Sequence, residues 1–141
     1  MPALADASVS DRFTIGYLQD TWITCMFSEV ESLKQIYERF NARDVERVLV
    51  GMHEDVLWAN GMEGGYVQGR EGVRSYWKRQ WEMVDPTVEP VSFSKGARGE
   101  VIVEVHQTVR DLEGNVLLDH MVGHIFWLED GLIKRFDIRG A

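Results

Sequence analysis

The second half of the chain consists of strand-like segments joined by short turns, and this feature most restricts the folds available to it. Residues 101–110, VIVEVHQTVR, alternate valines with larger or polar side chains, which is the pattern of a strand with two different faces. DLEGN is a typical hairpin connection to a longer strand over 116–129, and EDG turns the chain into a last strand over 132–139. With a further strand over 87–94, this pattern predicts an antiparallel, meandering sheet.

The first half carries three helical segments. Residues 28–41 open with SEVE, a capping box, and continue with apolar residues at helical spacing. A short helix over 45–49 and a third helix over 70–84 follow, and a strand over 55–60 and a glycine-rich loop lie between them. This order predicts an α+β fold in which three N-terminal helices pack on the concave face of a curved antiparallel sheet and leave a pocket.

Composition and charge exclude several classes of function. A chain of 141 residues with 45% apolar residues is expected to form one domain with its own core. The net charge of −8 argues against nucleic acid and anionic membranes as partners, because phosphate groups require a basic surface. There is no run of about 18 apolar residues, so we expect no membrane span. Cys25 is the sole cysteine, which excludes an internal disulfide, and we expect a cytoplasmic protein.

The N-terminus is expected to stand apart from the domain. We assign residues 1–27 to an N-terminal extension and residues 28–141 to the domain. Within the extension, residues 11–27 are rich in aromatic side chains and fit an extra strand, the start of a helix or a segment packed on the domain. Asp6 and Asp11 precede the first positive charge, which does not fit a secretory signal peptide.

The order of elements resembles that of a known family. GREGVRSYW after the first strand and LEDGLIKRFD near the C-terminus are similar to the nuclear transport factor two-like superfamily, and more narrowly to SnoaL-like and ketosteroid-isomerase-like proteins. The resemblance covers about residues 28–139 and implies a cystatin-like α+β roll with a small-molecule pocket, often paired as a homodimer. Isomerases, polyketide cyclases, epoxide hydrolases and dehydratases share this fold, so the activity has to be argued from the residues.

The family's best-known catalytic acids are absent from the matching positions. The general base of ketosteroid isomerases would fall on Ala59 or Asn60, and their second, protonated acid near Val122 or Gly123. Neither position holds a carboxylate. The resemblance therefore implies the fold of these isomerases and argues against their steroid chemistry.

Two other branches of the superfamily match in part. Limonene-epoxide-hydrolase-like members have a tyrosine and an asparagine that resemble Trp58 and Asn60, but their arginine and aspartate would fall near Glu104 and His106. Scytalone-dehydratase-like members keep a pair of histidines in the pocket. In residue type and location, this pair is the family feature most similar to the histidines on the strands of this chain.

Two histidines lie on one side of the longest strand. His120 and His124 are four residues apart, and side chains with that spacing share a face of a sheet. The geometry of the family directs this face toward the concave pocket, together with Val122 and Phe126. Both histidines also fit the role of core residues with satisfied hydrogen bonds, which is the alternative interpretation.

The hairpin predicts how the next strand pairs. A loop with Gly114 in the left-handed conformation pairs Asp111 with Asn115, so that paired residue numbers add up to 226. In this register His106 lies opposite His120 inside the pocket. A shift of one residue would place the two histidines on opposite faces of the sheet.

The same register predicts an apolar outer face. Val101, Val103 and Val105 would lie outside with Ile125 and Trp127. A patch of this size is typical of an interface. We therefore expect a homodimer through the outer face of the sheet.

Acid–base chemistry suits this set of residues. Histidine titrates near neutrality, so His106 or His120 could remove a proton from a small carbonyl or hydroxy compound while the other protonates the oxygen. Asn60 and Tyr66 could orient the substrate. His106, His120 and Glu104 could together reach one metal ion, but their spacing matches no known ligand motif and we expect neither metal nor cofactor.

The complete prediction is a small-molecule pocket. We expect a cofactor-free lyase or isomerase, cyclase- or dehydratase-like, acting on a small cyclic or aromatic metabolite, with a non-catalytic ligand-binding or dimerisation module as the alternative. The aromatic residues Trp58, Trp77 and Trp81 also fit a plain core. The predicted catalytic residues are His106, His120 and Asn60, and the predicted substrate-binding residues are Trp58, Tyr66, Trp77, Glu104, Val122, His124, Phe126, Phe136 and Ile138.

Overall fold

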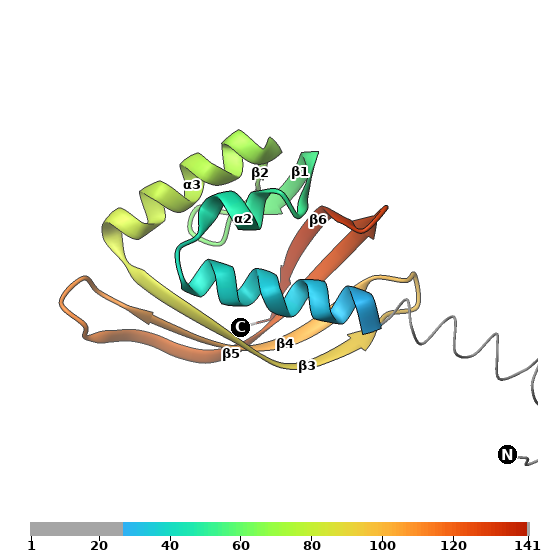
Figure 1. Cartoon of the computed structure of the whole chain (residues 1–141). Helices are drawn as coiled ribbons and strands as arrows, with labels where there is room; N and C mark the ends of the chain where they lie inside the picture. Colours follow the sequence, from blue (N-terminus) through green and yellow to red (C-terminus); the bar gives the residue numbers. More distant parts are fainter. Residues whose placement is uncertain (1–26, 141) are drawn as a thin grey trace, which may run out of the picture. The chain divides into compact units, whose positions relative to one another are not determined.

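The computed structural model describes residues 27–140 (Figure 1). The extension predicted over residues 1–27 lies outside the described residues except for its last residue, so it stays a prediction. The chain divides into two compact units, Met1–Leu33 and Lys34–Ala141. The first unit is described only for the helical residues 27–33, and every contact below lies within the second unit.

A helix covers residues 27–41, and eight further helices and strands follow it. They are α2 (Val45–Leu49), β1 (Met52–Ala59), β2 (Tyr66–Gln68), α3 (Gly69–Met83), β3 (Asp85–Lys95), β4 (Val101–Arg110), β5 (Val116–Glu129) and β6 (Leu132–Arg139).

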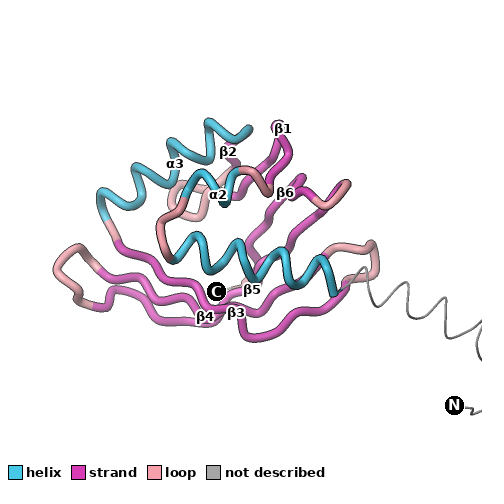
Figure 2. The backbone as a smooth tube through the Cα atoms, in the orientation of Figure 1, coloured by secondary structure: helices cyan, strands magenta, loops and turns pink. Residues whose placement is uncertain are grey.

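The strands form one sheet in the order β2-β1-β6-β5-β4-β3. Every neighbouring pair is antiparallel except β1 and β6, which run parallel. Figure 2 shows α2 and α3 on the same side of the sheet. The predicted α+β roll is therefore confirmed, and β2, a three-residue strand inside the predicted glycine-rich loop, is the element that the sequence pattern missed.

The valines of β4 face inward, which contradicts the predicted apolar outer patch. Val101, Val103 and Val105 are at most 1% exposed and belong to the core. The outer face at the same strand carries charged side chains instead, with Arg139 donating to Glu104 at 2.8 Å. Burying three valines is worth several kcal/mol at about 25 cal/mol per Å², so this orientation is strongly favoured over the predicted one.

A β-bulge explains why the predicted faces were reversed. The turn forms as predicted, because Asp111 N–H donates to the Asn115 carbonyl at 2.8 Å and Gly114 has a φ of 96°. Arg110 pairs with Val116, but the next pair joins Val109 to Leu118. Leu117 is thus an extra residue on β5.

The bulge changes the partner of every β4 residue from Val101 to Val109. Paired residue numbers now add up to 227, so Gln107 lies opposite His120 and His106 lies opposite Met121. A one-residue shift moves a whole strand face to the other side of the sheet. The predicted pairing of His106 with His120 is therefore wrong.

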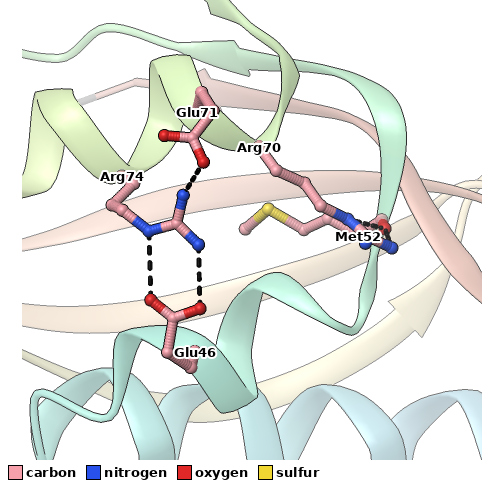
Figure 3. A network of polar contacts seen from close by, with 5 residues as sticks. All are labelled: Glu46, Met52, Arg70, Glu71 and Arg74. Carbon is pink, nitrogen blue, oxygen red and sulfur yellow. Dashed lines mark hydrogen bonds and ion pairs between the residues drawn. The ribbon is translucent and has the colours of Figure 1, made fainter.

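Polar contacts fix α3 against its neighbours (Figure 3). Arg74 donates to both carboxylate oxygens of Glu46 on α2, at 2.8 and 3.0 Å, and also contacts Glu71. Arg70 donates from its Nε to the Met52 carbonyl at 2.9 Å, at the start of β1. An exposed ion pair such as Arg74–Glu46 contributes little to stability because water and salt screen it, so it orients α3 more than it stabilises it.

The end of the helix over residues 27–41 is tied to the edge strand. The Asn41 side chain donates to the Val88 carbonyl at 2.7 Å and accepts from the Val88 N–H at 3.0 Å. This bidentate contact holds residues 34–41 along β3. Among the residues that the structure describes, no helix is long and apolar enough to cross a membrane.

Candidate functional site

A cavity of about 380 Å³ lies between the inner face of the sheet and the helices. Residues 34–41, α3 and strands β1, β3, β4, β5 and β6 all contribute to its wall. Most of the wall is apolar and aromatic, including Trp58, Trp77, Phe126 and Phe136. The volume falls within the roughly 300–1,000 Å³ typical of small-molecule sites.

The aromatic side chains hold each other in place on one side of the cavity. Trp58 on β1 stacks on Phe136 on β6 with ring centroids 4.0 Å apart, and these two residues are also partners in the parallel ladder. Trp77 from α3 meets Trp58 edge to face at 5.3 Å. This part of the wall is an apolar surface of rings packed on one another, which suits a ring compound.

Tyr37 and His124 form a buried polar pair in the wall. The Tyr37 hydroxyl lies 2.7 Å from His124 Nδ1, and the two rings are parallel. His124 is 7% exposed, and burial lowers its pKa from 6.5 to about 3. Burial also raises the pKa of Tyr37 well above its ordinary value. Both groups are therefore neutral at physiological pH.

Counting the hydrogen-bond partners of both rings favours one direction for the bond between Tyr37 and His124. When the Tyr37 hydroxyl donates to Nδ1, the proton of the neutral His124 ring sits on Nε2, and only this N–H lacks a partner within residues 27–140. The reverse direction would leave the Tyr37 proton and the Nε2 lone pair both unpaired. We therefore assign the Nε2–H form of His124, which presents a donor to the cavity.

His120 is held by a different partner. Its Nε2 lies 2.8 Å from the Gln107 Oε1, directly across the β4–β5 ladder. An amide oxygen can only accept, so Nε2 carries the proton and Nδ1 of the neutral ring has a bare lone pair. His120 can thus accept a proton.

Tyr76 contributes a third polar group. The Gly61 N–H donates to its hydroxyl oxygen at 3.1 Å, and burial raises the pKa of Tyr76 above its ordinary value. The hydroxyl therefore keeps its proton. Since Tyr76 also lines the cavity, this proton can be offered to a ligand.

The structure brings together eight of the predicted site residues. They line the cavity, and they are His120 together with Trp58, Trp77, Val122, His124, Phe126, Phe136 and Ile138. Their catalytic and binding roles stay predictions.

His106 and Glu104 lie outside the cavity, on the outer face of the sheet. His106 donates from Nε2 to Asp119, and this hydrogen bond raises its pKa. Glu104 forms an ion pair with Arg139 at 2.8 Å. The bulge at Leu117 is the reason why Glu104 and His106 face outward. The two side chains therefore lie on the opposite face from His120, and the three do not form the predicted metal arrangement.

Asn60 and Tyr66 also lie outside the cavity wall. The Asn60 Oδ1 accepts from the N–H groups of Met62 and Glu63, at 3.1 and 2.9 Å, and so closes the loop after β1. Tyr66 donates its hydroxyl to Asp137 and accepts from Arg135 at 3.0 Å. Both side chains are occupied by protein partners, and their predicted roles toward a substrate stay predictions.

Four polar wall residues were not predicted as site residues. Tyr37 was visible only as part of the apolar stripe of a helix, and Tyr76 had the same appearance in α3. Gln107 was assigned to no face because of the wrong register. Gln80 follows Trp77 by three residues on α3, so it lies on the same helix face, and this spacing was the one signal that could have found it.

The wall carries no aspartate, glutamate, lysine or arginine among the described residues. Charged residues precede or follow several wall residues without being part of the wall, and some of them are paired with each other. Arg135 and Asp137 flank Phe136 and bond each other, with Nε to Oδ2 at 2.9 Å. Over the described range there is also no group of three or more histidine, cysteine, aspartate or glutamate side chains that could hold a metal ion.

An α+β roll with a buried, uncharged cavity is typical of small-molecule proteins of the nuclear transport factor two-like superfamily. The sequence model of the SnoaL-like domain matches residues 33–136. The chain therefore belongs to the SnoaL-like domain family. A comparison with curated proteins finds no match.

Solved structures share the fold. TerC, co-crystallised with polyporic acid, has 25% sequence identity and a TM-score of 0.71, over 81% of this chain and 92% of TerC. The epoxide hydrolase/cyclase-like enzyme SalBIII has 19% identity and a TM-score of 0.67, over 79% and 88% of the two chains. RV0760c from Mycobacterium tuberculosis, in complex with estradiol-17beta-hemisuccinate, has 15% identity and a TM-score of 0.69, over 81% and 94%.

Proposed function

We propose that the cavity binds a small cyclic or aromatic carbonyl compound and transfers a proton on it without a cofactor. The reaction would be that of a lyase or isomerase, cyclase- or dehydratase-like. The observation that carries this proposal is the pair of histidines in one apolar cavity, because His124 presents a donor and His120 presents an acceptor.

In this mechanism the carbonyl oxygen of the substrate accepts from His124 Nε2–H. The donor stays neutral because the pKa of His124 is about 3, and a neutral imidazole can stabilise the charge that develops on oxygen in the transition state. Donors of this kind, placed in a site without water, are typically worth a factor of about 100 or more in rate. The Tyr76 hydroxyl is a second candidate donor.

His120 would remove the proton next to the carbonyl with its Nδ1 lone pair. The electrons of the broken C–H bond move onto the carbonyl oxygen as an enolate. The protonated His120 then returns the proton, either to another carbon in an isomerisation or to a β-hydroxyl that leaves as water. General acid–base catalysis of this kind contributes about 100- to 10,000-fold.

The comparisons support the substrate class. TerC was co-crystallised with polyporic acid and RV0760c with estradiol-17beta-hemisuccinate, and the name of SalBIII refers to epoxide hydrolase and cyclase chemistry. The aromatic wall formed by Trp58, Trp77 and Phe136 suits ring compounds in the same way.

Hydrogen–deuterium exchange tests the proton transfer without knowledge of the natural substrate. Tetralone, a bicyclic ketone, is incubated with the protein in D₂O, and deuterium uptake next to the carbonyl is followed by NMR. We expect acceleration by the wild type and its loss in His120→Gln. The matched control is His106→Gln, which removes a histidine on the outer face and should retain the acceleration. Equal loss in both variants, or no acceleration at all, contradicts the catalytic proposal.

A non-catalytic ligand-binding protein is the second candidate. The predominance of apolar side chains in the wall favours it, since such a wall binds a ring compound without any chemistry. Tetralone binding without exchange would be the result expected for this candidate.

The homodimer and the cytoplasmic location are also proposals. The family resemblance supports a dimer through the outer face, where Met121 is 48% exposed, although the three valines predicted there face the core. Light scattering coupled to size exclusion should then give twice the mass of the chain. The mass of a single chain would contradict the dimer.

A further inference from the structure

We propose that the cavity selects uncharged ring compounds that carry a hydrogen-bond acceptor and rejects carboxylates and phosphates. The ligand class is therefore a neutral ketone or similar carbonyl compound. This inference rests on the proposed function only in taking the cavity to be the ligand site.

The first observation is the absence of a countercharge. The polar side-chain groups of the wall among the described residues are the hydroxyls of Tyr37 and Tyr76, the amides of Gln80 and Gln107, the two histidine rings, and the indole N–H groups of Trp58 and Trp77. Burial keeps His124 neutral and raises the pKa of both tyrosines. At a pH where ordinary histidine is neutral, an anion that enters such a cavity loses its hydration and gains no opposite charge, which costs several kcal/mol.

The second observation is that several nearby cations are already engaged. Arg43 donates to Asp85 and, at 2.8 Å, to the Pro86 carbonyl. Arg79, beside the wall residue Gln80, pairs with Glu63 at 3.7 Å. Arg139 follows the wall residue Ile138 and pairs with Glu104 on the outer face.

The third observation is the unsatisfied donor of His124. Its Nε2–H is the one ring group left without a partner by the Tyr37 contact, in a residue 7% exposed. A ligand oxygen that accepts from this N–H gains a hydrogen bond that a plain hydrocarbon of the same shape cannot form, so the cavity favours ligands with an acceptor.

Long-range electrostatics act in the same direction. The chain carries a net charge of −8, which lowers the local concentration of anions around it. Salt screens this term within about 10 Å at 0.1 M, whereas the missing countercharge in the cavity is not screened. The preference for neutral ligands should therefore persist at high salt.

Three compounds with the same naphthalene ring separate these effects. They are methyl naphthyl ketone, which is neutral with an acceptor, naphthoate, which is anionic, and ethylnaphthalene, which is neutral without an acceptor. Their dissociation constants are measured by calorimetry on the full chain at a pH of about 8.5, where ordinary histidine is neutral. We expect the ketone to bind at least tenfold more tightly than naphthoate and severalfold more tightly than ethylnaphthalene.

A new cation in the wall should reverse the preference. Gln80→Lys places an ammonium group at the cavity, and we expect the ratio of ketone to naphthoate affinity to fall at least tenfold. Gln68→Lys makes the same change of net charge on the exposed strand β2 and should keep the wild-type ratio. An equal effect of both substitutions would mean that only the net charge matters and would overturn the inference.

The outcomes separate the two proposals. If none of the three compounds binds, the cavity is not a ligand site for ring compounds, and the proposed function fails with the inference. If naphthoate binds as tightly as the ketone in the wild type, the ligand site stands and the charge selection is wrong. Equal affinity for the ketone and ethylnaphthalene would refute the role of the His124 donor.

Discussion

Two histidines of the same strand face share one tautomer and leave opposite ring nitrogens free, because their hydrogen-bond partners differ. His124 meets Tyr37 and is buried, so its Nδ1 accepts and its Nε2 keeps the proton. His120 meets an amide oxygen, so its Nε2 donates and its Nδ1 is bare. The alternation of a strand is enough to predict that the two histidines share a face. Their partners, Tyr37 from a helix and Gln107 from another strand, cannot be predicted from the pattern of one strand.

The buried state of His124 predicts a pH-dependent stability. The pKa of His124 is about 3 in the folded protein and about 6.5 in an unfolded chain, so the unfolded state binds more protons in between. Its stabilising contribution is fully present above pH 6.5 and is lost as the pH falls toward 3. Between pH 7 and pH 5 this amounts to about 2 kcal/mol.

Urea unfolding at the two pH values measures this contribution. We expect the difference in free energy of unfolding between pH 7 and pH 5 to be smaller by about 2 kcal/mol in His124→Gln. His106→Gln is the control, because the raised pKa of His106 stabilises at low pH and its contribution is lost as the pH rises. Removing the His106 ring therefore cannot reduce the loss of unfolding free energy between pH 7 and pH 5. An unchanged pH dependence in His124→Gln would contradict a neutral, buried ring.

Asn60 is expected to act on stability. Asn60→Ala removes the acceptor of two backbone N–H groups, which should cost about 1–2 kcal/mol in urea unfolding. Asn60→Asp together with Glu63→Gln keeps the acceptor for the two N–H groups. It also swaps donor and acceptor in the hydrogen bond between these two side chains. This double variant should retain the stability and the tetralone exchange. Loss of exchange in a stable double variant would restore Asn60 to a catalytic role.

At the scale of elements, the sequence predicts boundaries better than register. The limits of β5 and β6, the short helix at Val45–Leu49 and the left-handed Gly114 all follow from turn chemistry and periodicity. The extra residue Leu117 does not, because nothing in VLLDH distinguishes a bulged leucine from a paired one. Burial of the β4 valines decides the register, and burial is a property of the whole sheet.

Engineered disulfides test the register directly. Cysteines at Thr108 and Asp119, which lie opposite each other on the outer face, should oxidise to a disulfide in a Cys25→Ser background. Cysteines at Thr108 and Leu118 would be opposed only without the bulge, and they should stay reduced. Opposed residues bring their Cα atoms within the roughly 4.4–6.8 Å that a disulfide requires. The opposite result, judged by mobility on non-reducing gels, would favour the unshifted ladder.

For the whole molecule, the sequence predicts the architecture and most of the cavity wall. Three helical segments followed by a meander leave few ways to cover a sheet, and Trp58, Phe126 and Phe136 then have to face the helices. His106 and Glu104 were misplaced by the one-residue shift. Tyr37 and Tyr76 went unnoticed because their hydroxyls gain a role only when helices and sheet meet. The polar part of the site thus depends on contacts between distant segments.

A histidine NMR experiment tests the central claim most directly, namely that His124 and His120, and not His106, face a ligand cavity. Proton–nitrogen correlation spectra of the four histidines are recorded with and without methyl naphthyl ketone. The account predicts a protonated Nε2 for His124, and shifts of His124 and His120 on addition of the ketone. His53, which pairs with Glu129 at 3.3 Å, and His106 should stay unchanged. Shifts of His106 without His124, or a proton on His124 Nδ1, would contradict the account.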